Sequence, residues 1–261
     1  PGEQNGAYAT ATAVLTGGDI NVGAAKTVSP SLITEPRRHD PVTVTIGANQ
    51  GTSPASTLAP AEVRLVDSVA TSPEFWDYFN FVGLGTVTAP AGADRVTVGV
   101  YGPFGPGGAY QWVDSAKQEL TGIDMPVTAS QYPLIEGVRF VFSRDDGGFF
   151  STSVPAATWS TAITYDVVLR DELRTSGVAV DLPDTVENVV EVVSDRLNGE
   201  SSVIREAAAL VTLSLGTFEL EVAKVANDGV RSASAGESVP WDLTFTNAGT
   251  GYLTIEELRD E

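Results

Sequence analysis

Lysine is rare in this chain, and two of its three lysines lie in similar local sequences. Lys26 ends the alternating run 19–26, and Lys224 ends the run 219–224, so the two lysines are 198 residues apart. A neutral lysine amine is a nucleophile that can attack a carbonyl group. Twelve arginines accompany the three lysines. A lysine that recurs at an equivalent position is therefore the first candidate for chemistry.

The similarity continues downstream of both lysines. The tripeptide Asn-Gln-Gly at 49–51 corresponds to Asn-Ala-Gly at 247–249, again at a spacing of 198 residues. Further on, a strand-like run ending at Asp67 corresponds to one ending at Asp260, with a spacing shorter by five. A long internal period is typical of an array of modules.

Enzyme chemistry has little support in the sequence. The chain has a single histidine, His39, in a loop rich in proline and arginine, so a Ser-His-Asp relay would depend on that residue. No HExxH, P-loop GK[ST] or Gly-x-Ser-x-Gly motif occurs. We expect no enzyme activity and no cofactor.

Two other patterns in the sequence could form binding sites. Asp145-Asp146-Gly147 lacks the alternating acids of a calcium-binding EF-hand loop, so a plain turn is expected and no metal site is assigned. Weak surface calcium sites stay open, because the chain has 34 acidic residues. Tryptophans at 76 and 112 are candidate binding residues for a sugar, although packing in the core is the ordinary role of such residues.

Composition indicates a globular β protein that is not directed to nucleic acid or anionic membranes. The chain is 42% hydrophobic and contains many glycines and prolines between short alternating runs. Its net charge is −19, and the chain lacks the clusters of basic residues that binding to nucleic acids or anionic lipids requires. It has no cysteine, so disulfides do not stabilise it. The start at Pro1, without an initiator methionine, suggests a processed product or part of a longer protein.

Alternating runs predict strands along most of the chain. They cover 7–14, 19–26, 41–48, 61–67, 85–89, 95–101, 137–143, 159–169 and 186–193. The aromatic segment 75–81 is expected to be a strand or one helical turn. The apolar positions of 41–48 are one residue out of step with those of 241–245, which a β-bulge in one copy would explain.

The sequence predicts the following domain organisation. Residues 1–17 would close a preceding module, 18–195 would form a complete enlarged β-sandwich with a possible subdomain split near 126, and 218–261 would begin the next module. The connecting segment 196–217 contains the best helix candidate, 199–212. It also reads as a polar linker followed by a strand at 207–214, which we favour because Val211, Leu213 and Leu215 alternate.

The second copy resembles the DUF11 repeat domain of bacterial cell-surface proteins. The resemblance lies in the sequence from Phe218 to Lys224, in 235–249 with Asn247-Ala-Gly249, and in the ending Leu258-Arg-Asp260. It covers about 50 residues at each site and is looser in the first copy. The resemblance implies tandem immunoglobulin-like β-sandwiches on large secreted or wall-anchored proteins, which act as stalks and adhesins.

Surface proteins of this kind sometimes contain an isopeptide bond between a buried lysine and an asparagine. A nearby acid assists, because burial favours the neutral amine and the protonated acid. By this resemblance, Lys26 would react with Asn188 with Asp67 as the acid, and Asp166 is the reserve. Lys224 and Asp260 would be the same set in the next module, and Asn5 would belong to the previous one. The alternative is that Lys26 reaches to solvent and Asn188 caps a turn.

We therefore expect an all-β chain of tandem sandwich modules from an extracellular stalk or adhesin at the bacterial cell surface or wall. Its partners would be neighbouring modules of the same chain or like subunits. One alternative is a module that binds a carbohydrate or host protein through 75–81 and 102–112. Another is a filament subunit in which residues 1–16 of one copy complete the module 218–261 of the next.

Overall fold

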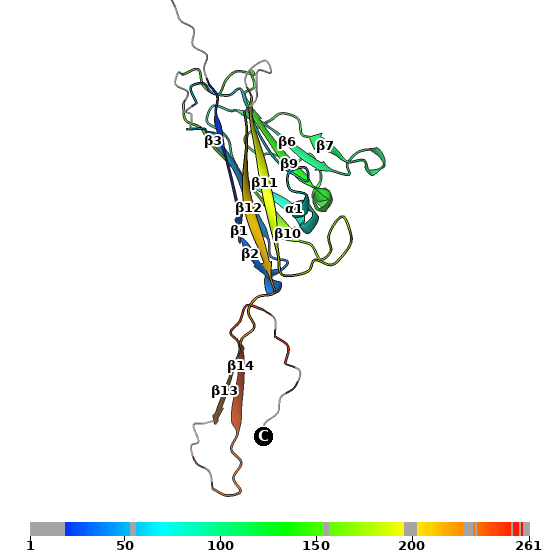
Figure 1. The fold of residues 1–261 in the computed structure, drawn as a ribbon, viewed down its shortest axis with the longest axis vertical. Helices are drawn as coiled ribbons and strands as arrows, with labels where there is room; N and C mark the ends of the chain where they lie inside the picture. The colour runs from blue at the N-terminus through cyan, green and yellow to red at the C-terminus, as the bar shows by residue number, and fades with distance from the viewer. Residues whose placement is uncertain are drawn as a thin grey trace, which may run out of the picture.

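The chain forms a β-sandwich, with a separate two-stranded hairpin beyond one end of it (Figure 1). The computed structural model describes residues 19–52, 56–153, 157–195, 203–226, 232, 234–251, 253–255 and 257. The expected strand 7–14 and the expected closing segment 1–17 lie outside this part of the chain. Within it, no helix is both long and apolar enough to cross a membrane.

The smaller sheet of the sandwich has four antiparallel strands. In spatial order they are β1 (Val22–Ser29), β3 (Val42–Gln50), β10 (Ser160–Leu169) and β5 (Phe79–Thr88). The pairing of β10 with β5 is interrupted by two shifts in register. Because β1 lies at an edge of this sheet, it lies close to the other sheet, next to β12 and β11.

The larger sheet forms the second layer. In order it contains β2 (Leu32–Thr34), β12 (Val203–Ser214), β11 (Asp184–Asp195), β4 (Glu62–Ser68), β9 (Gly137–Ser143), β6 (Arg95–Gly102) and β7 (Gln111–Asp114), with β8 (Gln118–Glu119) also paired to β6. In the described part of the chain, four short helices lie in the connections: η1 (Glu35–Arg37), α1 (Pro73–Tyr78), η2 (Pro106–Gly108) and η3 (Ala129–Leu134).

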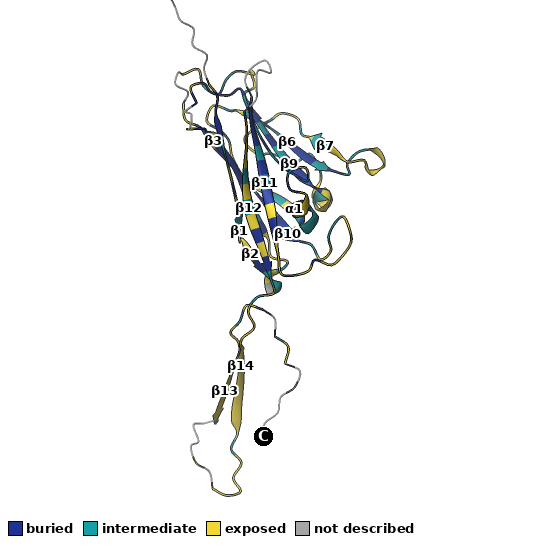
Figure 2. Cartoon of the chain, in the orientation of Figure 1, coloured by how far each residue is buried: buried dark blue, intermediate teal, exposed yellow. Residues whose placement is uncertain are grey.

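The core lies between the two sheets, as the two-residue period of the strands requires. Every second side chain of β3 and β10 is buried, and the same alternation runs through β4 and β6. Figure 2 shows the buried residues gathered in the sandwich, whereas the strands of the hairpin are exposed. Aromatic residues from α1 and β5 fill the space beside β10, where Phe75 and Phe79 stack at 4.7 Å. The expected all-β sandwich is confirmed.

The structure decides three points of the sequence predictions. Residues 203–214 form β12, which confirms the favoured strand at 207–214 over a helix, but β12 pairs along β11 and so belongs to the sandwich and not to a connecting segment. The split near 126 is wrong, because β9 inserts between β4 and β6 in one sheet. The aromatic segment 75–81 takes both predicted forms, because residues 75–78 lie in the helix α1 and residues 79–81 begin the strand β5.

The hairpin has strands β13 (Leu220–Ala226) and β14 (Trp241–Asn247). Lys224 pairs with Leu243, just as Lys26 pairs with Ile46 in the β1–β3 pair. Both ladders are continuous, so the expected β-bulge is not present in either of them. Lys224 and its partner Leu243 are 19 residues apart in the sequence, whereas Lys26 and its partner Ile46 are 20 apart. This difference of one residue explains why the apolar positions of the two copies are out of step.

The buried face of β4 offers a test of where the core lies. Leu65 is fully buried, whereas Leu210 on β12 is 57% exposed. Replacing Leu65 by alanine leaves a cavity, so we expect Leu65→Ala to lower the free energy of unfolding by about 2–5 kcal/mol in urea denaturation. Leu210→Ala should change it by less than about 0.5 kcal/mol. Equal losses in the two variants would contradict this packing.

Candidate functional site

Three polar side chains lie at inward positions of otherwise apolar strands. Lys26 lies on the same face of β1 as Val22, and Asp67 shares a face of β4 with Leu65. Asn188 lies in phase with buried valines on both sides of it in β11. Strand alternation therefore carries all three side chains into the core between the sheets.

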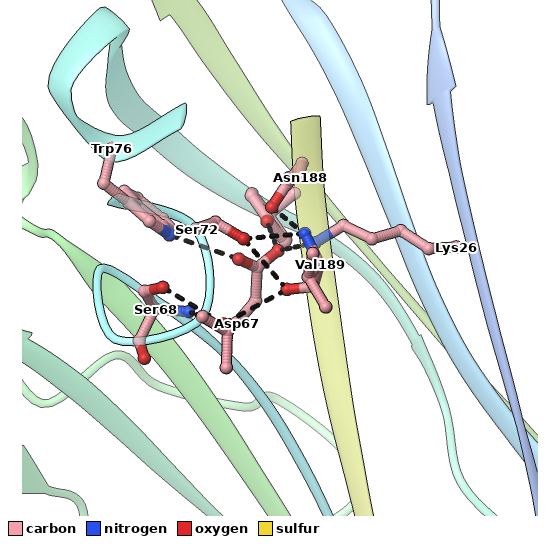
Figure 3. A network of polar contacts seen from close by, with 9 residues as sticks. Lys26, Asp67, Ser68, Ser72, Trp76, Asn188 and Val189 are labelled. Carbon is pink, nitrogen blue, oxygen red and sulfur yellow. Dashed lines mark hydrogen bonds and ion pairs between the residues drawn. The ribbon is translucent and has the colours of Figure 1, made fainter. Parts of the chain in front are cut away.

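The three side chains meet there. Lys26 Nζ lies 2.5 Å from Asp67 Oδ2 and 2.5 Å from Asn188 Oδ1. Neither side chain of the Lys26–Asp67 ion pair is exposed to solvent, and Asn188 is fully buried. Figure 3 shows Lys26 reaching from β1 to the other two residues. The structure thus brings together the lysine, asparagine and acid that the sequence analysis selected.

Two aromatic side chains hold the carboxylate of Asp67. Trp76 Nε1 donates a hydrogen bond to Oδ1 over 3.1 Å, and the hydroxyl of Tyr165 donates to Oδ2. The ring of Tyr165 stacks with two other rings. Its centre lies 6.2 Å from that of Trp76 and 5.8 Å from that of Phe81. These rings separate the site from solvent and fix both oxygens of Asp67.

The backbone beside Asn188 is also held in place. Ser72 Oγ accepts a hydrogen bond from Val189 N at 2.6 Å and donates one to Val189 O at 3.2 Å. This double contact joins β11 to the turn before α1 (Figure 3). Within the described residues, Asn188 Nδ2 has no hydrogen-bond partner. The oxygen of the carboxamide is held by Lys26.

Burial sets the electrostatics of the site. Desolvation lowers the pKa of Lys26 below its usual value, and the adjacent Asp67 carboxylate opposes this effect without cancelling it. Desolvation also raises the pKa of Tyr165 well above its usual value, and the charge of Asp67 adds to that rise. Burial therefore makes the Lys26 amine easier to deprotonate and the Tyr165 phenol harder to deprotonate.

This arrangement meets the requirements of acyl transfer to an amine. A lysine whose pKa is lowered becomes a nucleophile when it gives up a proton. The carboxylate of Asp67 lies within hydrogen-bond distance to accept that proton, and the carbonyl group of Asn188 is already in contact with the amine. Fixing both groups in one core replaces a bimolecular encounter by a high effective molarity.

The other residues of the predicted cross-link set lie elsewhere. Asp166, the reserve acid, is on the outer face of β10 and accepts a hydrogen bond from Thr43 Oγ1 at 2.7 Å. The reserve assignment is therefore wrong. Lys224 lies 5.2 Å from the ring centre of Trp241 on the hairpin. Asp260 and Asn5 lie outside the described residues.

The two candidate binding tryptophans have different environments. Trp76 is fully buried, so its assignment to a sugar-binding surface is wrong. Trp112 is half-buried on β7, with the Arg139 guanidinium 4.4 Å above its ring and Tyr101 beside it. Tyr110, whose side chain is exposed, contacts Tyr101 in turn.

Two loop features behave as ordinary surface structure. His39 is exposed, 3.6 Å from Asp171. Asp146 pairs with Arg144 and accepts a hydrogen bond from the backbone of Gly148, as in a polar turn.

The sequence analysis missed the roles of Trp76 and Tyr165. Tyr165 lies one residue before Asp166, and it was passed over because a tyrosine in an alternating strand looks like core packing. A phenol at an inward position of β10 needs a hydrogen-bond partner, and an inward acid such as Asp67 can supply one. That pairing of buried polar groups was the available signal.

Comparisons with known proteins give likenesses of structure only. No protein-family model and no curated protein matches the sequence, so the resemblance to DUF11 stays a prediction. The major pilin SpaD of Corynebacterium diphtheriae matches with a TM-score of 0.35 and 16% identity, over 84% of this chain and 39% of that one.

Two further structures are similar to this chain. A C-terminal fragment of the major pilin GBS80 of Streptococcus agalactiae matches with a TM-score of 0.39 and 10% identity, over 91% of this chain and 89% of the fragment. The collagen-binding subdomain of the Enterococcus faecalis surface protein ACE has a TM-score of 0.28 and 12% identity, over 72% of this chain and 95% of that one.

The buried ion pair can be tested through its acid. Asp67→Asn keeps the shape of the side chain but leaves Lys26 without a compensating charge, so we expect a loss of about 3–5 kcal/mol in the free energy of unfolding. Asp166→Asn, the matched change on the outer face, should cost about 1 kcal/mol. Urea denaturation of both variants checks this. Losses of the same size would count against a dominant role for the buried pair.

Proposed function

We propose that this chain is a structural segment of a bacterial cell-surface protein, a stalk or adhesin whose sandwich is closed by an isopeptide bond between Lys26 and Asn188. The observation that supports it is the burial of Lys26 in contact with both Asn188 and Asp67. In this proposal the chain is not an enzyme and uses no cofactor. Its location is extracellular, at the cell surface or wall.

The bond would form with loss of one ammonia molecule. Lys26 Nζ passes a proton to Asp67 Oδ2 and attacks Asn188 Cγ, and the C–Nζ bond forms as the carbonyl electrons move to Oδ1. Nδ2 gains the proton held by Asp67, the C–Nδ2 bond breaks as the carbonyl re-forms, and ammonia leaves. Nζ gives its remaining extra proton to Asp67, which ends protonated, and becomes the amide nitrogen of the new bond.

Such a bond would have a mechanical effect. It would join β1 of the smaller sheet to β11 of the larger one, between residues 162 positions apart. In the chain-entropy model, a cross-link closing a loop of that length stabilises the fold by about 5 kcal/mol. A chain without cysteine would gain from it what secreted proteins gain from disulfides.

The hairpin supports the tandem part of the proposal. In the hairpin Lys224 is paired with an apolar residue of the next strand, as Lys26 is in the pair of β1 and β3. Apolar residues such as Val222, Leu243 and Trp241 are exposed on the hairpin. In the first copy the equivalent face packs on the larger sheet. We infer that a neighbouring module or a like subunit covers this face of the hairpin, because apolar surface of this kind favours burial.

The mass of the intact chain tests the cross-link. We expect the purified parent to be lighter than its sequence by one ammonia molecule, and the Lys26→Ala and Asn188→Ala variants to show their full calculated masses. Without both groups the acyl transfer has either no nucleophile or no acceptor. Protease digestion of the parent should also give one branched peptide containing residues 26 and 188.

A matched lysine provides the control. Lys117 is exposed and donates to the backbone oxygen of Arg144, so Lys117→Ala should keep the ammonia loss. A parent chain with its full calculated mass would remove the cross-link from the proposal.

A surface of aromatic residues favours a second candidate function, which is binding of a carbohydrate. Tyr101, Tyr110 and Trp112 lie side by side on β6, β7 and the loop between them, with ring centres 5.5–5.9 Å apart. Aromatic rings beside hydrogen-bonding groups are suited to sugars, since one end of the contact is apolar and the other polar.

Binding to a glycan array tests this second candidate. Trp112→Ala should weaken any glycan binding of the parent by about tenfold or more, because truncating a central aromatic contact has effects of this size. The exposed Trp241 on the hairpin is the matched control, and Trp241→Ala should bind like the parent. Thermal unfolding of both variants shows whether folding is intact. Unchanged glycan binding by Trp112→Ala would exclude this surface.

A further inference from the structure

The hydroxyl group of Tyr165 lies at the centre of the buried site. It donates to Asp67 Oδ2, the same oxygen that accepts from Lys26 Nζ. It also interacts with the side-chain amide of Asn188, which partly opposes the rise in the pKa of the phenol. Tyr165 and Asn188 therefore contact the same buried ion pair, the phenol at Asp67 Oδ2 and the carboxamide at Lys26 Nζ.

Formation of the proposed isopeptide bond requires a proton at Asn188 Nδ2. This nitrogen must leave as ammonia, since an amide anion is a very poor leaving group. Asp67, which takes the proton from Lys26, contacts the amine through its Oδ2 atom. The amine in turn contacts Asn188 at Oδ1 and not at Nδ2. Nδ2 has no hydrogen-bond partner within the described residues. A group that links Asp67 to Nδ2 is needed.

Other nearby donors are unsuited to this role. The indole of Trp76 only donates, and its hydrogen is directed to Asp67 Oδ1. The hydroxyl of Ser72 both accepts from and donates to the backbone of Val189. The phenol of Tyr165 can accept one proton while it donates another.

We propose that Tyr165 transfers a proton from Asp67 to Asn188 Nδ2 as the isopeptide bond forms, an inference that rests on the proposed cross-link. In the tetrahedral intermediate, protonated Asp67 gives its proton to the phenol oxygen while the phenol gives its own proton to Nδ2. The C–Nδ2 bond breaks and ammonia leaves. Asp67 then takes the surplus proton from Nζ, so the tyrosine is unchanged and the acid ends protonated.

The environment of the phenol suits a concerted transfer. Its pKa is raised by burial and by Asp67, so it stays protonated and does not form a free tyrosinate. It gives up its proton only as it gains another. The stacked rings of Trp76 and Phe81 hold the phenol in the position that this transfer requires.

The rate of bond formation in newly made chains tests the proposal. The full chain is synthesised in a short pulse in a cell-free system, and the ammonia loss is followed by intact mass. Tyr165→Phe keeps the packed ring and removes the hydroxyl, so we expect a rate about 100-fold lower, the usual contribution of a general acid. Tyr78→Phe removes a similar phenol-to-carboxylate hydrogen bond, to Asp184, away from the site, and should react at the rate of the parent.

A change in acidity separates proton transfer from packing. Placing 3,5-difluorotyrosine at position 165 makes the phenol more acidic with little change in shape, so a proton donor should alter the rate and a packing group should not. A normal rate in Tyr165→Phe, or an unchanged rate with the fluorinated residue, would overturn the role of Tyr165 while leaving the cross-link. A parent chain that never loses ammonia would instead overturn the cross-link on which this role rests.

Discussion

The structure depends on one constraint, which is that a lysine lies inside the core of a β-sandwich. A buried ammonium group costs several kcal/mol unless it is paired and hydrogen-bonded. Asp67 provides the pairing charge, and Trp76 and Tyr165 complete the hydrogen bonds of that acid. The packing of α1 and β10 around the acid is thus linked to the position of Lys26. A site of this kind is more costly than an apolar core, which suggests a use beyond stability.

The same constraint links the two sheets. Lys26 belongs to an edge strand of the smaller sheet, while Asp67 and Asn188 belong to strands β4 and β11, which pair with each other in the larger sheet. Noncovalent contacts alone would let the edge strand separate under load. A bond between Lys26 and Asn188 would make that edge the most strongly joined part of the sandwich, whereas the free edges at β5 and β7 would have hydrogen bonds only on one side.

Much of this arrangement could be predicted from the sequence because a period of two residues is a local signal. The alternation around Lys26, Asp67 and Asn188 places each of them on an apolar face, and their meeting required only that these faces share one core. The roles of Trp76 and Tyr165 were not predictable in this way. They depend on how α1 packs against β11 and on which strand becomes the neighbour of β5, and both are set by contacts between distant segments.

A strand at 207–214 was expected, but its placement outside the sandwich was wrong for a related physical reason. Its buried residues lie only near its end, at Val211 and Leu213, while the earlier positions are exposed or half-buried. A strand of that kind gives a weak alternating signal, and its stability comes from the ladder with β11. Because β12 pairs along the strand that contains Asn188, it holds β11 from the side opposite β4. The segment that looked like a linker therefore helps to fix the carboxamide against Lys26.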